Sequence, residues 1–471
     1  MGRRRCCRSR PALFRARNRR TPLCCRFRPH VHRGDQLSCP GHRRRPGSTR
    51  SPPCPLHLKC PSRFRHLCRT GQIRGEVMRL RVGIVGGSIA GCAVAIAARR
   101  AGCEVTVFER SARDLSARGF GIALPNPLWQ RLVEQGYLPP GVPSCVVHRR
   151  VWLTRDDVTP HGRELWHQPS SARTLNWATL WRNLRTQLPA DIYRTAAHVQ
   201  EVVIGQEHGL IRLGDGGETR CHVVVGADGA RSLVRQCIAP GVLPTHARYV
   251  LCRGSVAAQQ VAPIATAMRN LDGAYVTVMF QRGHAVFYWI PSSSSCRTSP
   301  QRILNWAVYS QSVPISPHAA AEPARRVLCA ALEEMPQEWA DLVRLTSPEA
   351  VTTHPVADLT MQSYVRGPLL LAGDAGTIAR PHAASGAAKA LEDALFLERL
   401  LASHADVAAL LAAYDKERCP AGNDLVKIGR RIGRHQVEAP PDWSRMTEQD
   451  LPAWTASTLA GSPHYLYQQG A

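Results

Sequence analysis

Acidic side chains are nearly absent from the first 77 residues of this 471-residue chain. Asp35 and Glu76 face 21 Lys and Arg there, so this stretch supplies 21 − 2 = +19 of the formal net charge of +26. It also lacks hydrophobic periodicity and any apolar run long enough for a signal peptide or a membrane-spanning helix. Because such a composition cannot bury a core, we expect residues 1–77 to be a disordered extension or not part of the native protein, which would then begin at Met78.

Regular cysteine spacing is missing as well. Eight of the 17 cysteines lie in this extension, yet no CxxC pair or zinc-finger spacing occurs, and we predict no metal site. The other nine are scattered through apolar or helical surroundings, which favours reduced thiols and a cytoplasmic location. For residues 1–77 a zinc site, an organelle transit peptide and a nucleic-acid-binding tail stay open. We expect no nucleic acid to bind the folded part and no segment to span a membrane.

A βαβ pattern occupies residues 80–110. A β-branched run over 81–85 precedes the glycine-rich turn GGSIAG (86–91), a helix is expected over 89–100, and a second strand over 104–108 ends at Glu109. Gly86 permits the tight turn, Ser88 lets a pyrophosphate approach the backbone, and Gly91 allows the helix to pack on the strand. The helix start favours an anion, and Glu109 is placed to bind a ribose, so the pattern predicts a dinucleotide such as FAD or NAD.

Two later strands each end in a short motif with glycine and aspartate. An apolar run over 223–226 leads into GADGARSLVR, which contains Asp228, and another over 368–372 leads into Gly373 and Asp374. A long helix is expected to begin near Gly386. Between these motifs, β-branched and aromatic runs over 274–280, 284–290 and 305–309 predict strands of an antiparallel sheet.

Together the three motifs GGSIAG with Glu109, GADGARSLVR and GDAGTIARPHAASGAAKALEDA resemble those of the class A FAD-dependent aromatic hydroxylases, the para-hydroxybenzoate hydroxylase superfamily. The Arg380-Pro381-His382 run is similar to the dihydroxypyridine hydroxylase branch. The resemblance covers roughly residues 80–434. It implies an α/β fold in which a Rossmann-like FAD-binding domain, with a βαβ unit of the glutathione reductase type, carries an inserted antiparallel-sheet substrate domain and C-terminal helices.

Domain boundaries follow from this resemblance. We expect a first part of the FAD-binding domain over 78–245, the substrate domain over 246–360, and the second part of the FAD-binding domain over 361–400. Helices and a tail would occupy 401–471, with the tail irregular after Glu438.

The resemblance also implies site residues. The expected FAD contacts are Gly86, Ser88, Ile89, Ala90, Gly91, Glu109, Arg110, Asp228, Asp374, Gly386, Ala387 and Ala388. His382 is the expected catalytic base, because a phenol or hydroxypyridine is activated by losing its proton. Tyr249, Arg253 and Tyr288 are weaker candidates for the substrate pocket. A purely structural role stays open for Asp228 and for His382.

The activity implied is that of an FAD-dependent monooxygenase. Such an enzyme would use NADH or NADPH and O2 to hydroxylate a small electron-rich aromatic compound through a flavin C4a-hydroperoxide. The sequence contains no second nucleotide motif, and it does not choose between the two nicotinamides. A flavin dehydrogenase, oxidase or halogenase is the main alternative, followed by a flavin-binding or nucleic-acid-binding protein. A homodimer is left open.

Overall fold

Three β-sheets organise the part of the chain that the computed structural model describes, which is residues 79–117, 120–264, 270–294, 301–311, 321–403 and 406–459. Residues 76–471 belong to one unit, and the predicted extension over 1–77 lies outside the described residues. The described helices are α1 (Ile89–Arg100), α2 (Asn126–Glu134), α3 (Trp177–Arg185), α4 (Leu233–Ile238), α5 (Ala258–Val261), α7 (Ala321–Glu334), α8 (Gln337–Arg344), α9 (Gly386–Ser403), α10 (Val407–Gly433) and α11 (Leu451–Leu459).

A six-stranded sheet carries the three motifs. Its order is β16-β17-β10-β1-β2-β6, with strands β1 (Arg81–Val85), β2 (Glu104–Phe108), β6 (Tyr193–Arg194), β10 (Val223–Gly226), β16 (Val365–Arg366) and β17 (Leu369–Leu371). All neighbours are parallel except β16 and β17. The central strands are almost wholly buried, which explains their continuous apolar sequence. Because parallel strands share one carboxyl edge, the three motifs meet there.

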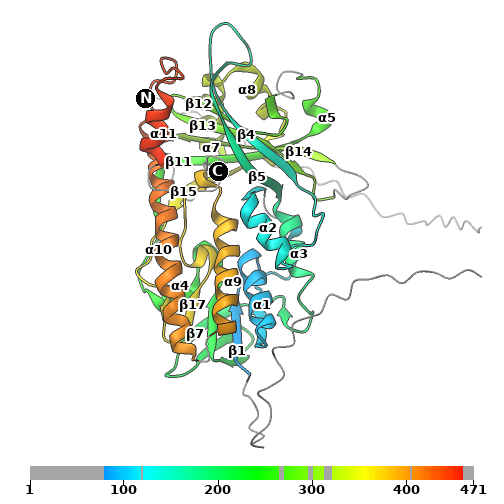
Figure 1. Cartoon of the computed structure of the whole chain (residues 1–471), viewed down its shortest axis with the longest axis vertical. Helices are drawn as coiled ribbons and strands as arrows, with labels where there is room; N and C mark the ends of the chain where they lie inside the picture. The colour runs from blue at the N-terminus through cyan, green and yellow to red at the C-terminus, as the bar shows by residue number, and fades with distance from the viewer. Residues whose placement is uncertain are drawn as a thin grey trace, which may run out of the picture. The chain divides into compact units, whose positions relative to one another are not determined.

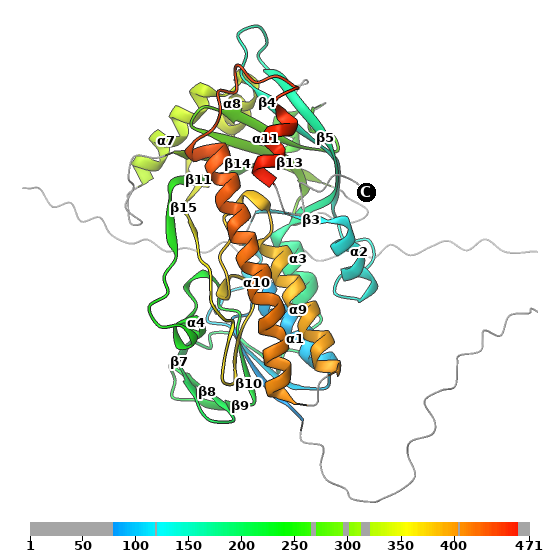
Figure 2. The same cartoon turned by 60° about the vertical axis from the view of Figure 1, so that its left-hand side comes forward.

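Helices α1, α9 and α10 lie side by side in both views (Figures 1 and 2). The α1 and α9 helices are rich in alanine and bury most of their residues, so the two helices approach closely. A small antiparallel sheet of β7 (Val199–Ile204), β8 (Gly209–Leu213) and β9 (Glu218–Cys221) packs with α4 and with the strands β1 and β10. The predicted βαβ unit is therefore confirmed as part of an α/β fold.

An eight-stranded sheet forms the second layer, in the order β15-β11-β14-β13-β12-β4-β5-β3. Its strands are β3 (Gly121–Pro125), β4 (Cys145–Thr154), β5 (Arg163–Asn176), β11 (Thr245–Ala257), β12 (Ala274–Phe280), β13 (Gly283–Pro291), β14 (Arg302–Gln311) and β15 (Thr352–Asp358). All neighbours are antiparallel except β4 and β12. The predicted antiparallel sheet is confirmed, and helices α7 and α8 pack on its outer face (Figure 1).

The boundary expected at residue 245 does not separate the two sheets. Strands β3, β4 and β5 precede it in the sequence but belong to the eight-stranded sheet, in which β4 pairs with β12, β5 with β4 and β3 with β5. The physical reason is packing: Trp152 and Ala172 point into the same core as Tyr249 and Val286. The substrate layer is thus built from two separate stretches of sequence.

The tail was also expected to be irregular after Glu438, but the helix α11 follows there. Trp454 of this helix packs edge-on against Trp152, with ring centroids 5.4 Å apart, and against Trp443 at 5.2 Å. These contacts come from distant parts of the chain, and a helix of nine residues depends on them. None of the helices in the described ranges is long and apolar enough to cross a bilayer.

Candidate active site

Gly86 and Ser88 of the glycine-rich turn, directly before α1, form part of the wall of a 590 Å³ pocket. Gly86 has a positive φ of 100°, and a Cβ there would overlap the carbonyl oxygen of Ala227, while a Cβ on Gly91 would overlap the carbonyl oxygen of Gly86. Only glycine therefore fits at either position. Ser88 precedes α1 without bonding to the helix through its side chain, which leaves the first N–H groups of α1 open to an anion.

Glu109 closes the other side of this pocket. Its buried carboxylate accepts hydrogen bonds from the backbone N–H of Gly87 at 2.8 Å and of Ser111 at 2.8 Å. Arg110 also lines the pocket and is exposed. The carboxylate is thus fixed at the tip of β2, beside the turn, as the βαβ pattern predicts.

Asp228 lies across the pocket and braces the turn that follows β10. Its Oδ2 accepts from the N–H of Leu233 at 2.7 Å, and its buried Oδ1 has no partner among the described residues. Burial raises the pKa of this carboxyl, while hydrogen bonds from Ser232 and the backbone lower it. Three features of this pocket fit a dinucleotide. The glycine-rich turn leaves no room for a Cβ, the carboxylate of Glu109 is held in place, and Oδ1 of Asp228 is open to a donor.

The Asp374 motif adjoins the same region. Gly373 packs against Ala90 of α1, and a Cβ on Gly386 would lie 3.8 Å from Oδ1 of the exposed Asp374. The carboxylate of Asp374 therefore lies at the start of α9, whose first turn contains Ala387 and Ala388. Arg235 joins the two aspartate motifs, because its buried guanidinium donates to the carbonyls of Ala230 at 2.5 Å and Ala375 at 3.1 Å.

Two supporting groups were not predicted. The carbonyl oxygen of Gly87 accepts from the Tyr193 hydroxyl at 2.8 Å and from Trp181 Nε1 at 3.0 Å, so residues far along the chain hold the turn in place. Nothing local in the sequence marks these two side chains. Their role depends on β6 and α3 folding against the turn.

The second group is a buried ionic cluster behind Gly373. Asp393 accepts from Lys389 Nζ at 2.8 Å, from Arg418 Nε at 2.8 Å and from the N–H of Gly373 at 2.9 Å. Burial alone would raise the pKa of the Asp393 carboxyl, but Lys389 and Arg418 hold it below its usual value. Lys389 and Asp393 stand four residues apart in an apolar helix, and that spacing was the available clue.

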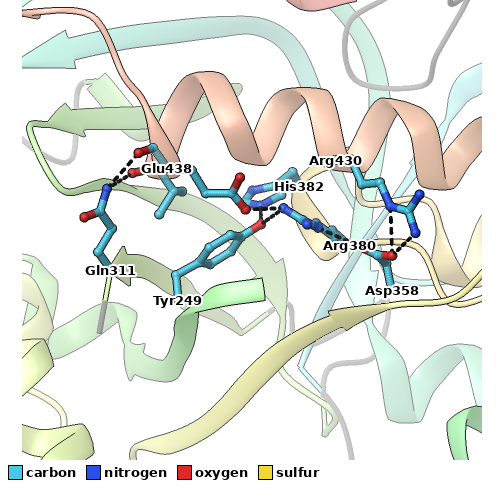
Figure 3. Close-up of polar contacts among 8 residues, drawn as sticks. Tyr249, Gln311, Asp358, Arg380, His382, Arg430 and Glu438 are labelled. Atoms are coloured by element: carbon cyan, nitrogen blue, oxygen red, sulfur yellow. Dashed lines mark hydrogen bonds and ion pairs between the residues drawn. The ribbon is translucent and has the colours of Figure 1, made fainter. Parts of the chain in front are cut away.

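His382 belongs to the short 3-10 turn Pro381–Ala383 and contacts the inner face of the eight-stranded sheet. Its ring lies 4.4 Å from that of Tyr309 and 5.2 Å from that of His284, measured between centroids. Its Nε2 is 2.6 Å from the hydroxyl of Tyr249 on β11 (Figure 3). The loop that follows Asp374 therefore meets the sheet at His382.

The Tyr249 hydroxyl is bonded both to this histidine and to Arg380. It accepts a hydrogen bond from Arg380 Nη1 at 3.2 Å, and which atom donates in its bond to His382 Nε2 depends on which ring nitrogen of His382 carries the proton. Burial, aided by Arg380, lowers the pKa of His382 to about 3, so the ring is neutral. If Tyr249 donates to Nε2, the neutral ring carries its proton on Nδ1, which has no partner among the described residues. The other tautomer leaves Nδ1 as an acceptor, so the expected role of His382 as a base stays a prediction.

Arg380 is itself held by two carboxylates. It donates from Nε to buried Asp358 at 2.8 Å and from Nη1 to Glu438 at 2.6 Å, and Arg430 donates to the other oxygen of Asp358 at 2.9 Å (Figure 3). Burial lowers the pKa of Arg380, but Tyr249 and the hydrogen bonds to Asp358 and Glu438 outweigh burial and hold that pKa above its usual value. None of these acidic partners was predicted.

The two other substrate candidates lie elsewhere on the inner face. The Tyr288 hydroxyl donates to the carbonyl of Gly121 at 3.1 Å, and its ring stacks on Tyr275 at 4.9 Å. Arg253 lies over the ring of Phe120 at 5.8 Å. The structure thus brings Tyr249 to His382 but places Tyr288 and Arg253 near residues 120–121. A buried arginine that the sequence did not single out, Arg150, lies on the same face and donates to Thr277 Oγ1 at 3.2 Å.

Comparison with known proteins gives a consistent picture. The family model described as "FAD binding domain" matches residues 79–428. The chain is 29% identical over 375 residues to 2,6-dihydroxypyridine 3-monooxygenase of Paenarthrobacter nicotinovorans, covering 75% of this chain and 91% of that protein. It is 27% identical over 387 residues to salicylate hydroxylase of Pseudomonas putida, covering 74% and 84%.

Solved structures support the same fold. The structure of 2,6-dihydroxypyridine-3-hydroxylase from Arthrobacter nicotinovorans superposes with a TM-score of 0.67 and 25% identity, covering 78% of this chain and 96% of that one. The structure of Klebsiella pneumoniae HpxO complexed with FAD and uric acid gives a TM-score of 0.66 at 18% identity, covering 80% of this chain and 92% of that one. At this identity the likeness shows only that the fold is shared.

Proposed function

Because the chain belongs to the FAD binding domain family, and is an FAD-dependent aromatic monooxygenase that uses NAD(P)H and O2, we propose that its substrate is a small phenol or hydroxypyridine. The observation that carries this proposal is the meeting of two layers at His382. This residue follows the Asp374 motif in the FAD-binding half, and it touches Tyr249, Tyr309 and His284 on the inner face of the sheet.

Bound FAD would supply the electron transfer from NAD(P)H to O2 and the transfer of oxygen to the ring. We propose that the N–H groups at the start of α1, with Ser88, Ile89 and Ala90, bind its pyrophosphate, and that Glu109 binds the adenosine ribose, next to Arg110. Asp374 would bind the ribityl chain or pyrophosphate. The N–H groups of Gly386, Ala387 and Ala388 would face the flavin pyrimidine, since a helix start stabilises negative charge.

The substrate would lie on the inner face of the eight-stranded sheet. Arg150 and Arg253 place positive charge on this face, which favours the deprotonated form of a phenol or hydroxypyridine. His382 would contact the hydroxyl oxygen of the substrate as a hydrogen-bond donor through Nδ1–H. Such a donor stabilises the oxygen's negative charge without accepting its proton. A base other than His382, or water, would then remove the proton.

Isotope labelling tests this proposal. FAD-saturated protein is mixed with NADH or NADPH and 18O2 in the presence of phenol, salicylate or 2,6-dihydroxypyridine as probes. We expect one 18O atom in the hydroxylated product and nicotinamide oxidation that the active probe stimulates. Hydrogen peroxide without labelled product for every probe would favour an oxidase, and a halide-dependent product would favour a halogenase. A homodimer and a cytoplasmic location stay predictions.

A further inference from the structure

A cationic cleft lies apart from the glycine-rich turn, where the end of α4, strand β16 and helix α10 come together. Its volume is 840 Å³, and its walls include Arg366, Lys427 and Arg430. Asn423 adds a polar group, and Pro240 and Val242 form part of an apolar wall. This size falls within the range of about 300 to 1,000 Å³ that is usual for ligand sites.

The cleft keeps positive charge after its internal contacts are counted. Lys427 pairs with Asp424 at 2.8 Å, but both side chains are exposed, so this pair is weak and Lys427 can turn to a ligand. Arg366 donates to the carbonyl oxygen of Cys237 at 3.0 Å. Because a carbonyl is neutral, this bond does not compensate the positive charge of Arg366. Arg430 is half-exposed, and its carboxylate partner Asp358 is shared with Arg380.

We propose that this cleft binds the phosphate groups of the reduced nicotinamide dinucleotide, an assignment that rests on the function proposed above. The reaction needs this second nucleotide, whereas the pocket at the glycine-rich turn fits the FAD, and the sequence contains no second turn of that kind. Guanidinium and ammonium groups from two elements suit a pyrophosphate, and the apolar wall suits a base.

The cleft is connected to the substrate side by direct hydrogen bonds. Arg430 and Arg380 donate to the two oxygens of Asp358, Arg380 donates to the Tyr249 hydroxyl, and that hydroxyl shares a hydrogen bond with His382 (Figure 3). A phosphate that draws Arg430 into the cleft weakens its bond to Asp358 and frees that carboxylate for Arg380. Nucleotide binding and the hydrogen bonding of His382 are therefore coupled, and such coupling is reciprocal.

Direct binding tests the assignment without turnover. FAD-saturated protein is titrated with NADP+ by calorimetry, and Arg366→Ala and Lys427→Ala are compared with Lys416→Ala, which removes an exposed cation of α10 outside the cleft. We expect the dissociation constant to rise about tenfold in each cleft variant, as for loss of one charged hydrogen bond, and to stay unchanged in the control. Unchanged NADP+ affinity in both cleft variants would overturn the assignment.

Inorganic pyrophosphate separates the two sources of phosphate. If it competes with NADP+ in the wild type and both lose affinity in the cleft variants, the cleft holds the nucleotide. If only pyrophosphate loses affinity, the cleft is a site for free phosphates and the nucleotide assignment is wrong. Dithionite-reduced enzyme mixed with 18O2 and the aromatic probes needs no nicotinamide, so failure of the wild type there would refute the proposed function and leave the binding result intact.

The coupling has its own readout. The 15N resonances of the His382 ring should shift when NADP+ saturates the wild type, and the shift should vanish in Arg430→Gln, which loses the charged contact to Asp358. A shift of equal size in Arg430→Gln would exclude this route.

Discussion

Glu109 and His382 are both buried polar side chains, but their neighbours give them different chemistry. Glu109 accepts from two backbone N–H groups, which hold its carboxylate in place. Burial, aided by the charge of Arg380, lowers the pKa of His382 and favours its neutral form. Burial thus accompanies a carboxylate held by backbone N–H groups in one case and a neutral ring in the other.

Replacing Glu109 should weaken FAD binding. Glu109→Ala leaves the N–H groups of Gly87 and Ser111 without their acceptor and removes the proposed ribose contact, so we expect the FAD dissociation constant to rise about tenfold or more. Recovery of FAD fluorescence on dilution measures it. Glu104→Gln, an exposed position at the other end of β2, is the control. Equal FAD affinity in Glu109→Ala would refute the ribose contact.

His382 should make stability depend on pH. Its pKa is about 3 in the folded protein and 6.5 for a free histidine, so between these values the unfolded chain binds one more proton at this position. The free energy of unfolding should therefore fall as the pH drops below 6.5, by up to about 1.4 kcal/mol per pH unit.

Urea unfolding at pH 7, 6 and 5 checks this dependence. His382→Asn should flatten the slope by the contribution of one proton, whereas His167→Asn, which changes an exposed histidine, should leave it unchanged. The same slope in His382→Asn as in the wild type would contradict the lowered pKa.

At the scale of elements, α9 has a second role besides the proposed contact of its first turn with the cofactor, because it also holds the loop at Gly373. The cluster of Lys389, Asp393 and Arg418 ties α9 and α10 to Gly373, directly before Asp374. The helix thereby sets the position of a loop that precedes it in the sequence.

Asp393→Ala should destabilise the protein strongly. Two cations, Lys389 and Arg418, would remain buried without their shared carboxylate, and removal of one partner from such a cluster costs about 3–5 kcal/mol. We expect that loss in the free energy of unfolding, together with a lower FAD content after purification. Asp341→Ala, which breaks an exposed pair on α8, is the control. A loss as small as that of the control would mean that solvent reaches the cluster.

At the scale of the whole molecule, every described contact of the candidate site is made by residues 79–459. A chain that starts at Met78 should therefore fold and bind one FAD with the same affinity as the full chain. Absorbance spectra and FAD titration of the two proteins measure this. A shortened protein that aggregates or takes up no FAD would show that residues 1–77 are required.

Much of this protein was determined by local sequence. The βαβ unit over residues 80–110 and the motifs at Asp228 and Asp374 were predicted because tight turns and buried strands need particular residues next to one another. The predicted cofactor residues accordingly lie around one carboxyl edge of the sheet, and the strands of the antiparallel sheet follow from alternating or aromatic runs.

Only the tertiary structure decided the rest, because those properties depend on contacts between distant residues. It assigned β3, β4 and β5 to the second sheet, and it folded α11 against Trp152. It also brought the hydroxyl of Tyr249, which lies 133 positions away in the sequence, to His382 Nε2 and bonded the same hydroxyl to Arg380. Spacing in the sequence identifies a side chain, but its proton is placed by partners that the chain brings together only on folding.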